Sequence, residues 1–431
     1  MIFLLYDLIL YLSALFLVPY YLFRGLRYGK ARHGVRERLG IYAQDFRQLL
    51  EGRKIIWVHA VSVGETRAAI PLLKALKKKH PDALLVLSNV TETGRKIATK
   101  LSEIDHYIFF PFDLRWVVRK TLNIIQPDVI ILVETEIWPN FVLEAKSRNI
   151  PMVLVNGRIS DRSFPRYRMA GKLLVPILDS FSDFCMQSEQ DSRRIRHLGA
   201  ASGRVQVTGN LKFDMQPPAI DMTELEALKA ELKLPANGRI WVAGSTHDGE
   251  EKLLIDVYQN LRKICPELFL VLVPRHPERC RQVVDDLAKK DVDATLRSTV
   301  STMDKQFLPG EVMVVDTLGE MLKLYTLADL VFVGGSLVPT GGHNVLEASL
   351  VKKPVLFGPY MQNFKEIARL LRAAHGGLQV MDSDDLYRQM KILLENPSEA
   401  ERIGDNGRHL LQENQGATER TVSIISRYID D

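Results

Sequence analysis

The stretch KIIWVHAVSVGETRAAIPLLKALKKKH, residues 54–80, joins a short apolar run to a turn of small residues and then to apolar residues at helical spacing. This pattern predicts a buried β-strand that leads through a tight turn into an amphipathic helix. Glu65 stands at that junction, directly after Gly64. A carboxylate in the first turn of a helix complements the helix dipole. The carboxyl end of a buried strand is also where open α/β sheets place their ligands, so the position leaves both interpretations open.

The same alternation of apolar strands and amphipathic helices continues along the chain in two series. The first predicts strands at 54–60, 83–89, 106–112, 128–134, 151–157 and 183–188, and the second at 239–246, 267–277, 311–317, 329–336 and 353–359. Continuous apolar runs separated by helices indicate parallel sheets that are covered on both faces. We therefore predict an α/β protein with two facing Rossmann-like domains, and a ligand site in the cleft between them.

Composition excludes several classes of protein. The chain has 431 residues, 46% of them hydrophobic and 25% charged, which is typical of a globular protein with two domains and an appendage. The net charge of +5 is small for this length, so we expect no nucleic acid partner. Cys185, Cys265 and Cys280 lie far apart in the sequence and predict neither a zinc site nor a disulfide framework.

The amino-terminal residues 1–23 are almost wholly apolar, interrupted by Asp7 and Pro19, and are about as long as one bilayer crossing. No basic segment precedes these residues and no cleavage site follows them, so we do not expect a signal peptide. We predict a membrane anchor helix with the domains on the cytoplasmic side, because the basic residues follow the apolar run. A helix that lies in the membrane interface remains the alternative. The basic residues that would contact lipid headgroups are Arg24, Arg27, Lys30, Arg32, Arg36 and Arg38.

Three loops of the second series have the character of anion sites. In AGSTHDGEE (243–251), Ser245 and Thr246 precede an expected helix start near His247, where free N–H groups would bind phosphate. In VPRHPER (273–279), Arg275 offers paired donors to a phosphate. The glycine-rich stretch 333–349 leads to an expected helix start near Asn344, with Glu347 placed to hold ribose hydroxyls. Together these loops predict a nucleotide-type ligand in the second domain.

The first domain has carboxylates at its strand ends instead. Glu65 follows one strand, Glu134 and Glu136 follow another, and Lys212 stands at the end of the domain. Nucleotide loops in one domain and carboxylates in the other are typical of a group transferase. One carboxylate would take the proton of an acceptor hydroxyl, and Lys212 would neutralise charge on a departing phosphate.

No metal ion or other cofactor is expected. Asp382, Ser383 and Asp384 could pass for a metal-binding DxD motif, but they immediately precede a helical stretch, where capping explains them better. The sequence also has no HExxH motif and no cluster of histidines.

The ordered set of segments resembles one family closely, the 3-deoxy-D-manno-octulosonic acid (Kdo) transferases of lipopolysaccharide assembly. The matching segments are HAVSVGETRAAIPL, ETEIWPN, GNLKFD, GSTHDGEE, VPRHPER, DTLGEM, GGSLVPTGGHNVLEA and NFKEI. The resemblance implies a GT-B glycosyltransferase of family 30 that moves Kdo from CMP-Kdo to a lipid A precursor (lipid IVA) at the cytoplasmic face of the inner membrane. The expected partners are these two substrates and inner-membrane lipids.

The resemblance also assigns roles to residues. Glu65 matches the catalytic base, and Glu136 and Lys212 match positions that stabilise the transition state. The positions that match CMP-binding segments are Pro274, Arg275, Leu318, Gly319, Glu320, Asn344, Val345, Leu346 and Glu347.

The expected organisation combines these parts. It comprises an anchor (1–23), a basic juxtamembrane segment (24–50), an acceptor domain (51–213), a linker (214–237), a nucleotide-sugar domain (238–410) and a final helix that packs back on the first domain (411–431). A membrane-associated transferase that uses a UDP-sugar and a non-catalytic nucleotide sensor remain the alternatives. The sequence leaves open the number of Kdo residues added, the acyl-chain preference and the oligomeric state.

Overall fold

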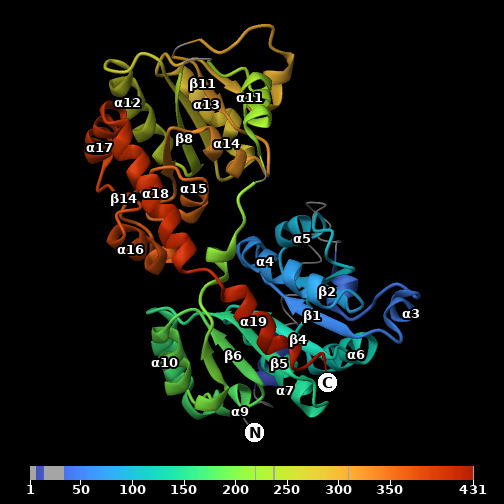
Figure 1. Cartoon of the computed structure of the whole chain (residues 1–431). Helices are drawn as coiled ribbons and strands as arrows, with labels where there is room; N and C mark the ends of the chain where they lie inside the picture. The colour runs from blue at the N-terminus through green and yellow to red at the C-terminus, as the bar shows by residue number, and fades with distance from the viewer. Residues whose placement is uncertain (1–5, 14–33, 219, 236–237, 309, 431) are drawn as a thin grey trace. The chain divides into compact units, whose positions relative to one another are not determined.

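The computed structural model describes residues 6–13, 34–218, 220–235, 238–308 and 310–430 (Figure 1). The chain forms two compact units. One consists of Met1–Met215 together with Asn414–Asp431, and the other of Gln216–Glu413. Each unit is built on its own seven-stranded sheet, and all the strand pairs are parallel.

The sheet of the first unit has the order β3-β2-β1-β4-β5-β6-β7. Because the chain starts in the middle and builds outward first to one side and then to the other, the order reverses between β1 and β4. The strands are β1 (Ile55–His59), β2 (Leu84–Asn89), β3 (His106–Phe109), β4 (Val129–Val133), β5 (Met152–Gly157), β6 (Asp183–Met186) and β7 (Val205–Val207).

Helices connect these strands and cover both faces of the sheet. They are α2 (Val35–Arg38), α3 (Phe46–Leu50), α4 (Val63–Lys79), α5 (Glu92–Ala98), α6 (Arg115–Ile125), α7 (Pro139–Ser147), α8 (Ser163–Ala170), α9 (Val175–Leu178) and α10 (Glu189–His197), with 3-10 turns η1 (Gly171–Leu173), η2 (Ser202–Arg204) and η3 (Leu211–Asp214).

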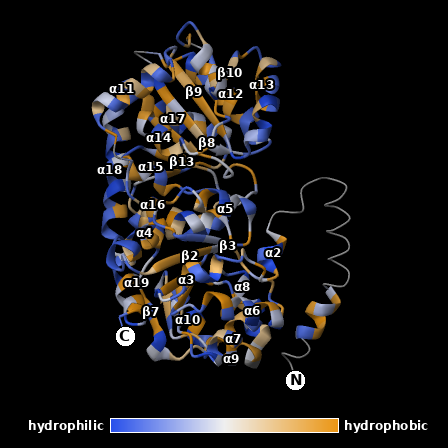
Figure 2. Ribbon diagram, turned by 90° about the vertical axis from the view of Figure 1, so that its right-hand side faces the viewer, coloured by the Kyte–Doolittle hydropathy of each residue, from blue (hydrophilic) through white to orange (hydrophobic). Residues whose placement is uncertain are grey.

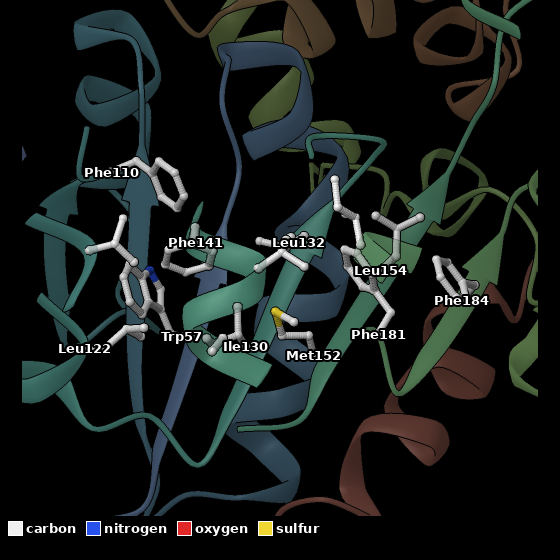
Figure 3. Packing of buried hydrophobic residues seen from close by; sticks show 14 of the residues in the cluster. Trp57, Phe110, Leu122, Ile130, Leu132, Phe141, Met152, Leu154, Phe181 and Phe184 are labelled. Carbon is white, nitrogen blue, oxygen red and sulfur yellow. The ribbon is translucent and has the colours of Figure 1, made fainter. Parts of the chain in front are cut away.

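The core of this unit consists of two apolar clusters, one on each face of the sheet. Successive residues of β1 alternate between them, since Trp57 belongs to one cluster and Ile56 and Val58 to the other. Figure 3 shows the first cluster, with Trp57 and Phe141 at one end and Phe181 and Phe184 at the other. The rings of Trp57 and Phe141 meet edge to face at 5.1 Å. A core on both faces explains why these strands read as continuous apolar runs.

The last helix, α19 (Ala417–Ser426), packs on the first unit, although the chain before it belongs to the second. The Asp214 carboxylate accepts hydrogen bonds from the backbone N–H groups of Gly416, at 2.7 Å, and Thr418. At the other end of α19, His80 Nε2 lies 2.9 Å from Ser426 Oγ. Polar contacts at both ends therefore fix the helix against the first unit.

The sheet of the second unit has the order β10-β11-β9-β8-β12-β13-β14 and reverses between β8 and β12. Figure 2 shows hydrophobic strands in both sheets, such as β9 and β2. The strands are β8 (Arg239–Thr246), β9 (Leu268–Pro274), β10 (Ala294–Leu296), β11 (Val312–Val314), β12 (Leu330–Val333), β13 (Val355–Phe357) and β14 (Leu378–Gln379).

The helices of the second unit cover both faces of that sheet. They are α11 (Met222–Glu231), α12 (Glu250–Arg262), α13 (Cys280–Ala288), α14 (Met321–Leu327), α15 (Leu346–Leu350), α16 (Lys365–Ala373), α17 (Ser383–Glu395) and α18 (Pro397–Glu413), with 3-10 turns η4 (Pro277–Arg279), η5 (Arg297–Thr302) and η6 (Gln362–Phe364).

The predicted anchor, residues 1–23, falls mostly outside the described residues, as do Arg24, Arg27, Lys30 and Arg32. Residues 6–13 are helical, and two of their side chains contact the first unit. The Tyr6 hydroxyl donates to Asp113 at 2.9 Å, and Asn140 Nδ2 donates to Asp7 at 2.6 Å. In the part of the chain that the structure describes, no helix has both the length and the apolar character needed to cross a membrane.

Candidate active site

Each sheet has one point where the strand order reverses, and some of the sequence-predicted site residues lie at these two points. In the first unit, the loops after β1 and β4 carry Glu65, Glu134 and Glu136. In the second unit, the loops after β8 and β12 carry His247 and the glycine-rich stretch. Neighbouring loops diverge at such a point and leave room for ligands at the carboxyl edge of a sheet.

Glu65 is held by the start of its own helix. Ser62 is the N-cap of α4, and its hydroxyl oxygen accepts from the Glu65 N–H. The Glu65 carboxylate in turn accepts from the Val61 N–H and from the Ser62 hydroxyl, the latter at 3.2 Å. This reciprocal arrangement is a variant of the capping box. The structural role suggested by the sequence is therefore real, and it fixes the carboxylate in one orientation.

The environment of Glu65 also suits proton transfer. The residue is only 9% exposed. Burial and the neighbouring Glu134 carboxylate raise the pKa of Glu65 to about 7, against the opposing effect of its hydrogen bond from Val61. A carboxyl group with a pKa near neutrality is suited to act as a general base in the cell.

Glu134, Glu136 and Lys212 lie beside Glu65. Glu134 directly follows β4 with a φ of 59°, a left-handed conformation that is uncommon for residues other than glycine. Lys212 Nζ lies 3.6 Å from Glu134 Oε1. Burial and Glu134 raise the pKa of Glu136, and Glu136 in turn contributes to the raised pKa of Glu65. The structure therefore brings three carboxylates and one ammonium group together at this edge.

Amide side chains position the turn that carries Lys212. Asn210 Oδ1 accepts from the Lys212 N–H at 3.0 Å, and its Nδ2 donates to Gln187 at 3.0 Å. Asn156, at the end of β5, accepts from the Leu211 N–H at 3.1 Å. Sequence reasoning did not identify these three residues, although an Asn directly before a short helical turn signals a cap.

The second unit brings together the loops after β8, β9 and β12. The Arg275 N–H donates to the Thr246 carbonyl at 2.9 Å. The rings of His247 and His343 stack, with Nε2 atoms 2.8 Å apart, and the ring of His276 meets that of His247 edge to face at 5.8 Å. Three histidines that are far apart in the sequence thus lie together in the fold, although the sequence showed no cluster of histidines.

Two details differ from the expected phosphate site at Ser245 and Thr246. Helix α12 begins at Glu250 and not near His247. The Thr246 side chain is fully buried and its hydroxyl donates to Glu251 at 3.1 Å, so this hydroxyl is engaged within the unit. Ser245 has a φ of 58°, which turns the chain sharply at the strand end.

The glycine-rich loop also differs from expectation. Its N–H groups at Gly335, Ser336 and Leu337 donate to the carboxylate of Glu250, at 2.7, 3.0 and 2.8 Å. We predicted that glycine-rich backbone here would accommodate a phosphate. Instead these three amides bind a carboxylate of the protein, a residue that the sequence analysis did not single out.

The remaining predicted donor residues lie around the same edge. Helix α15 begins at Leu346, near Asn344 as expected. Asn344 Nδ2 lies 3.4 Å from Oε1 of Glu347, which is in the first turn of that helix. Val345 and Leu346 are fully buried. The other positions are buried Pro274, Leu318, which is 73% exposed, Gly319, whose φ is 95°, and Glu320, which accepts from Arg297 at 3.1 Å.

The acidic motif at 382–384 is a helix cap, as expected. Asp382 precedes α17, and its side chain accepts from the Asp385 N–H at 2.8 Å. Within the described ranges, no group of three His, Cys, Asp or Glu side chains is arranged to hold a metal ion.

Solved structures share the fold at low sequence identity. A glycosyltransferase from Rickettsia africae has a TM-score of 0.60 at 14% identity, covering 88% of this chain and 100% of its own. A UDP-GlcNAc 2-epimerase from Neisseria meningitidis, bound to UDP-GlcNAc, has a TM-score of 0.59 at 15% identity, covering 87% and 99%. These likenesses show the GT-B arrangement of two parallel-sheet α/β domains. Because a transferase and an epimerase share it, the fold does not decide the reaction.

Relatives with similar sequences identify the reaction. Residues 33–215 match the family model of 3-deoxy-D-manno-octulosonic-acid transferase (kdotransferase). The 3-deoxy-D-manno-octulosonic acid transferase of Haemophilus influenzae is 36% identical over 408 residues, which cover 93% of this chain and 92% of the relative. That of Rickettsia felis is 32% identical over 380 residues, covering 88% and 80%. The chain therefore belongs to the Kdo transferase family, whose enzymes act in lipopolysaccharide biosynthesis.

Proposed function

We propose that this Kdo transferase takes Kdo from CMP-Kdo and attaches it to the lipid A precursor lipid IVA, at the cytoplasmic face of the inner membrane. One observation supports the proposed catalysis above all others: Glu65 is a buried carboxyl group at a strand end, with a pKa of about 7. A transferase that joins a sugar to a hydroxyl needs a group of this kind to remove the hydroxyl proton.

The proposed reaction is a single displacement with inversion at the anomeric carbon of Kdo. The acceptor hydroxyl oxygen forms a bond to that carbon while its proton passes to Glu65. The bond from the carbon to the phosphate oxygen breaks, and CMP leaves with the electron pair. Glu136 and Lys212 stabilise charge in the transition state, and the ion pair of Lys212 with Glu134 keeps the ammonium group at this edge.

The donor is bound by the second unit in this proposal. Arg275 offers a guanidinium group to the phosphate, and Ser245 lies at the same strand edge. The segments 318–320 and 344–347, with Pro274, hold the nucleoside. We propose that no metal ion takes part, because Lys212 and Arg275 supply the positive charge that a phosphate leaving group requires.

The membrane location is proposed from the sequence. An acylated acceptor stays in the bilayer, and the apolar residues 1–23 with the basic residues after them would bring the enzyme to it.

The experiment that tests the donor and acceptor is a mass-spectrometric assay in detergent with chelator present. Tetra-acylated lipid A precursor is incubated with CMP-Kdo generated in situ or, as the control, with UDP-sugars. We expect Kdo adducts with the CMP donor alone, and their number counts the transfers. Products formed only from a UDP-sugar would refute the proposed donor. Loss of product on chelation, restored by a divalent cation, would refute metal independence.

A further inference from the structure

The carboxylate of Glu250 lies where a glycine-rich loop of this kind would hold an anion. Its Oε1 accepts from the N–H groups of Ser336 and Leu337, at 3.0 and 2.8 Å. Its Oε2 accepts from the N–H groups of Gly335 and His247, at 2.7 and 3.1 Å. The residue is fully buried. Consecutive backbone N–H groups that converge in this way form an anion site, and here a side chain of the same unit fills it.

The glycines of the loop fit this internal carboxylate. A Cβ atom on Gly334 would lie 2.7 Å from the backbone of Thr246 and 2.8 Å from Glu250 Oε2. A Cβ on Gly335 would lie 3.0 and 3.1 Å from ring carbons of His343 and His247. Only glycine therefore permits both the contact of the loop with Glu250 and its contact with the histidines. The need for Gly334 and Gly335 is explained without a phosphate.

Glu250 also joins two loops that belong to the donor site proposed above. Its contact with the His247 N–H fixes the loop after β8, and its other three bonds fix the loop after β12. The histidine rings carried by these loops then stack, with a 7° angle between their planes. The second loop continues through Gly341 and Gly342 into Asn344, the first residue of a predicted nucleotide-binding segment.

We propose that Glu250 is a positioning residue of the donor site. Its carboxylate takes the amides of residues 335–337, holds the segment 335–347 in its binding shape, and leaves the anionic groups of the donor to side chains. The kinetic consequences of this inference rest on the proposed donor. The placement of the amides does not, because it is tested without an activity assay.

Amide hydrogen exchange of the full-length enzyme, with and without CMP, provides the first test. If Glu250 occupies the amides, those of Gly335, Ser336 and Leu337 are protected in the free enzyme as strongly as the amides of β8, and CMP changes their exchange by less than about threefold. Rapid exchange in the free enzyme that CMP suppresses would overturn the proposal, because the amides would then be the phosphate site.

Glu250→Gln provides the second test, because it keeps the size of the side chain but turns one acceptor oxygen into a donor that faces backbone N–H groups. We expect exchange at 335–337 to rise about tenfold or more, the size expected when charged hydrogen bonds to a buried group are lost. The KM for CMP-Kdo should rise by a similar factor while kcat changes less than about threefold. Glu250→Asp, which keeps the charge, should restore part of the affinity.

The matched control is Asp329→Asn. Asp329 accepts from the Ile240 N–H at 2.7 Å, at the opposite edge of the same sheet. It should leave exchange at 335–337 and the donor KM unchanged. An equal rise in KM in both variants would show that Glu250 affects only the general stability of the unit, and would overturn the positioning role. If CMP-Kdo proves not to be the donor, the exchange results still decide whether Glu250 holds the loop.

Discussion

Glu65 has two roles at once, as part of a helix cap and as a buried carboxylate with a raised pKa. As the third residue of α4 it completes the cap of the helix, through its contacts with Ser62 and Val61. As a buried carboxylate beside Glu134 it has a pKa of about 7. The capping contacts favour the ionised form, whereas burial and the neighbouring charge disfavour it. The balance leaves a base that is strong enough to accept a proton and is substantially ionised in the cell.

The activity should therefore rise with pH through about 7. A general base works only when it is deprotonated, and Glu65 loses its proton near that value. The dependence of kcat/KM on pH, measured with lipid IVA and CMP-Kdo, should show an ascending limb with a midpoint near 7. Glu134→Gln removes the neighbouring charge that raises the pKa of Glu65, so it should move the midpoint to lower pH. A limb that stays in place in this variant would show that another group titrates.

Stability should change with pH in the opposite sense. The pKa of Glu65 is about 7 in the folded chain, against an ordinary value of 4.5 in the unfolded chain, so the folded chain binds more protons between these values. The contribution of Glu65 to stability is therefore largest below about pH 4.5 and falls as pH rises to about 7. Urea unfolding of the wild type and of Glu65→Gln should differ by an amount that shifts by on the order of 3 kcal/mol across this window. A constant difference would contradict the shifted pKa.

At the residue scale, the sequence predicted which side chains gather but not how they interact. The strand-to-helix transition at Gly64 located Glu65, and the end of β4 located Glu134 and Glu136. The coupling of their carboxylates depends on strands 73 residues apart in the register of Ile56 with Val129, which sequence periodicity does not show. For the same reason Glu250 was missed, since three of its four N–H partners belong to a loop about 85 residues away.

At the scale of elements, buried apolar strands were predictable, including the short β11 and β13, and three edge strands with few buried residues were not. The strands predicted from apolar runs of the first series correspond to β1 through β6, because both faces of the sheet are covered. The short strands β7, β10 and β14 were missed. In β10 and β14 no residue is buried, so the sequences of these two strands lack the apolar run that signals a central strand.

The attachment of α19 to the first unit is also an element-scale property, and the buried carboxylate of Asp214 contributes to it beside the apolar contacts of Val422 and Ile425. Asp214→Ala removes the acceptor for the N–H groups of Gly416 and Thr418. We expect a loss of about 1–3 kcal/mol from the free energy of unfolding, the usual cost of leaving buried donors unpaired. Limited proteolysis should then cut near residues 414–416 sooner than in the wild type. The control is Asp430→Ala, a carboxylate that is 63% exposed and lies 3.5 Å from His80. Equal effects of both substitutions would refute the role of Asp214.

At the scale of the whole molecule, the division of labour follows from the two sheets. Each reverses its strand order once, and each places a different chemistry at its carboxyl edge: carboxylates with Lys212 in the first unit, and Arg275 with a glycine-rich loop in the second. A parallel sheet of either kind would pack equally well without these side chains. The fold therefore accounts for where the groups lie, while the groups themselves account for the transferase reaction.

The role of Glu65 as the base of this Kdo transferase is tested most directly by the transfer rate of Glu65→Gln. The wild type and this variant are compared in the mass-spectrometric assay with lipid IVA and CMP-Kdo, after CMP binding and thermal unfolding have shown that the variant is folded. We expect Kdo addition by the wild type and a rate lower by about 10²- to 10⁴-fold in the variant. A folded, CMP-binding variant that transfers Kdo at nearly the wild-type rate would contradict this role.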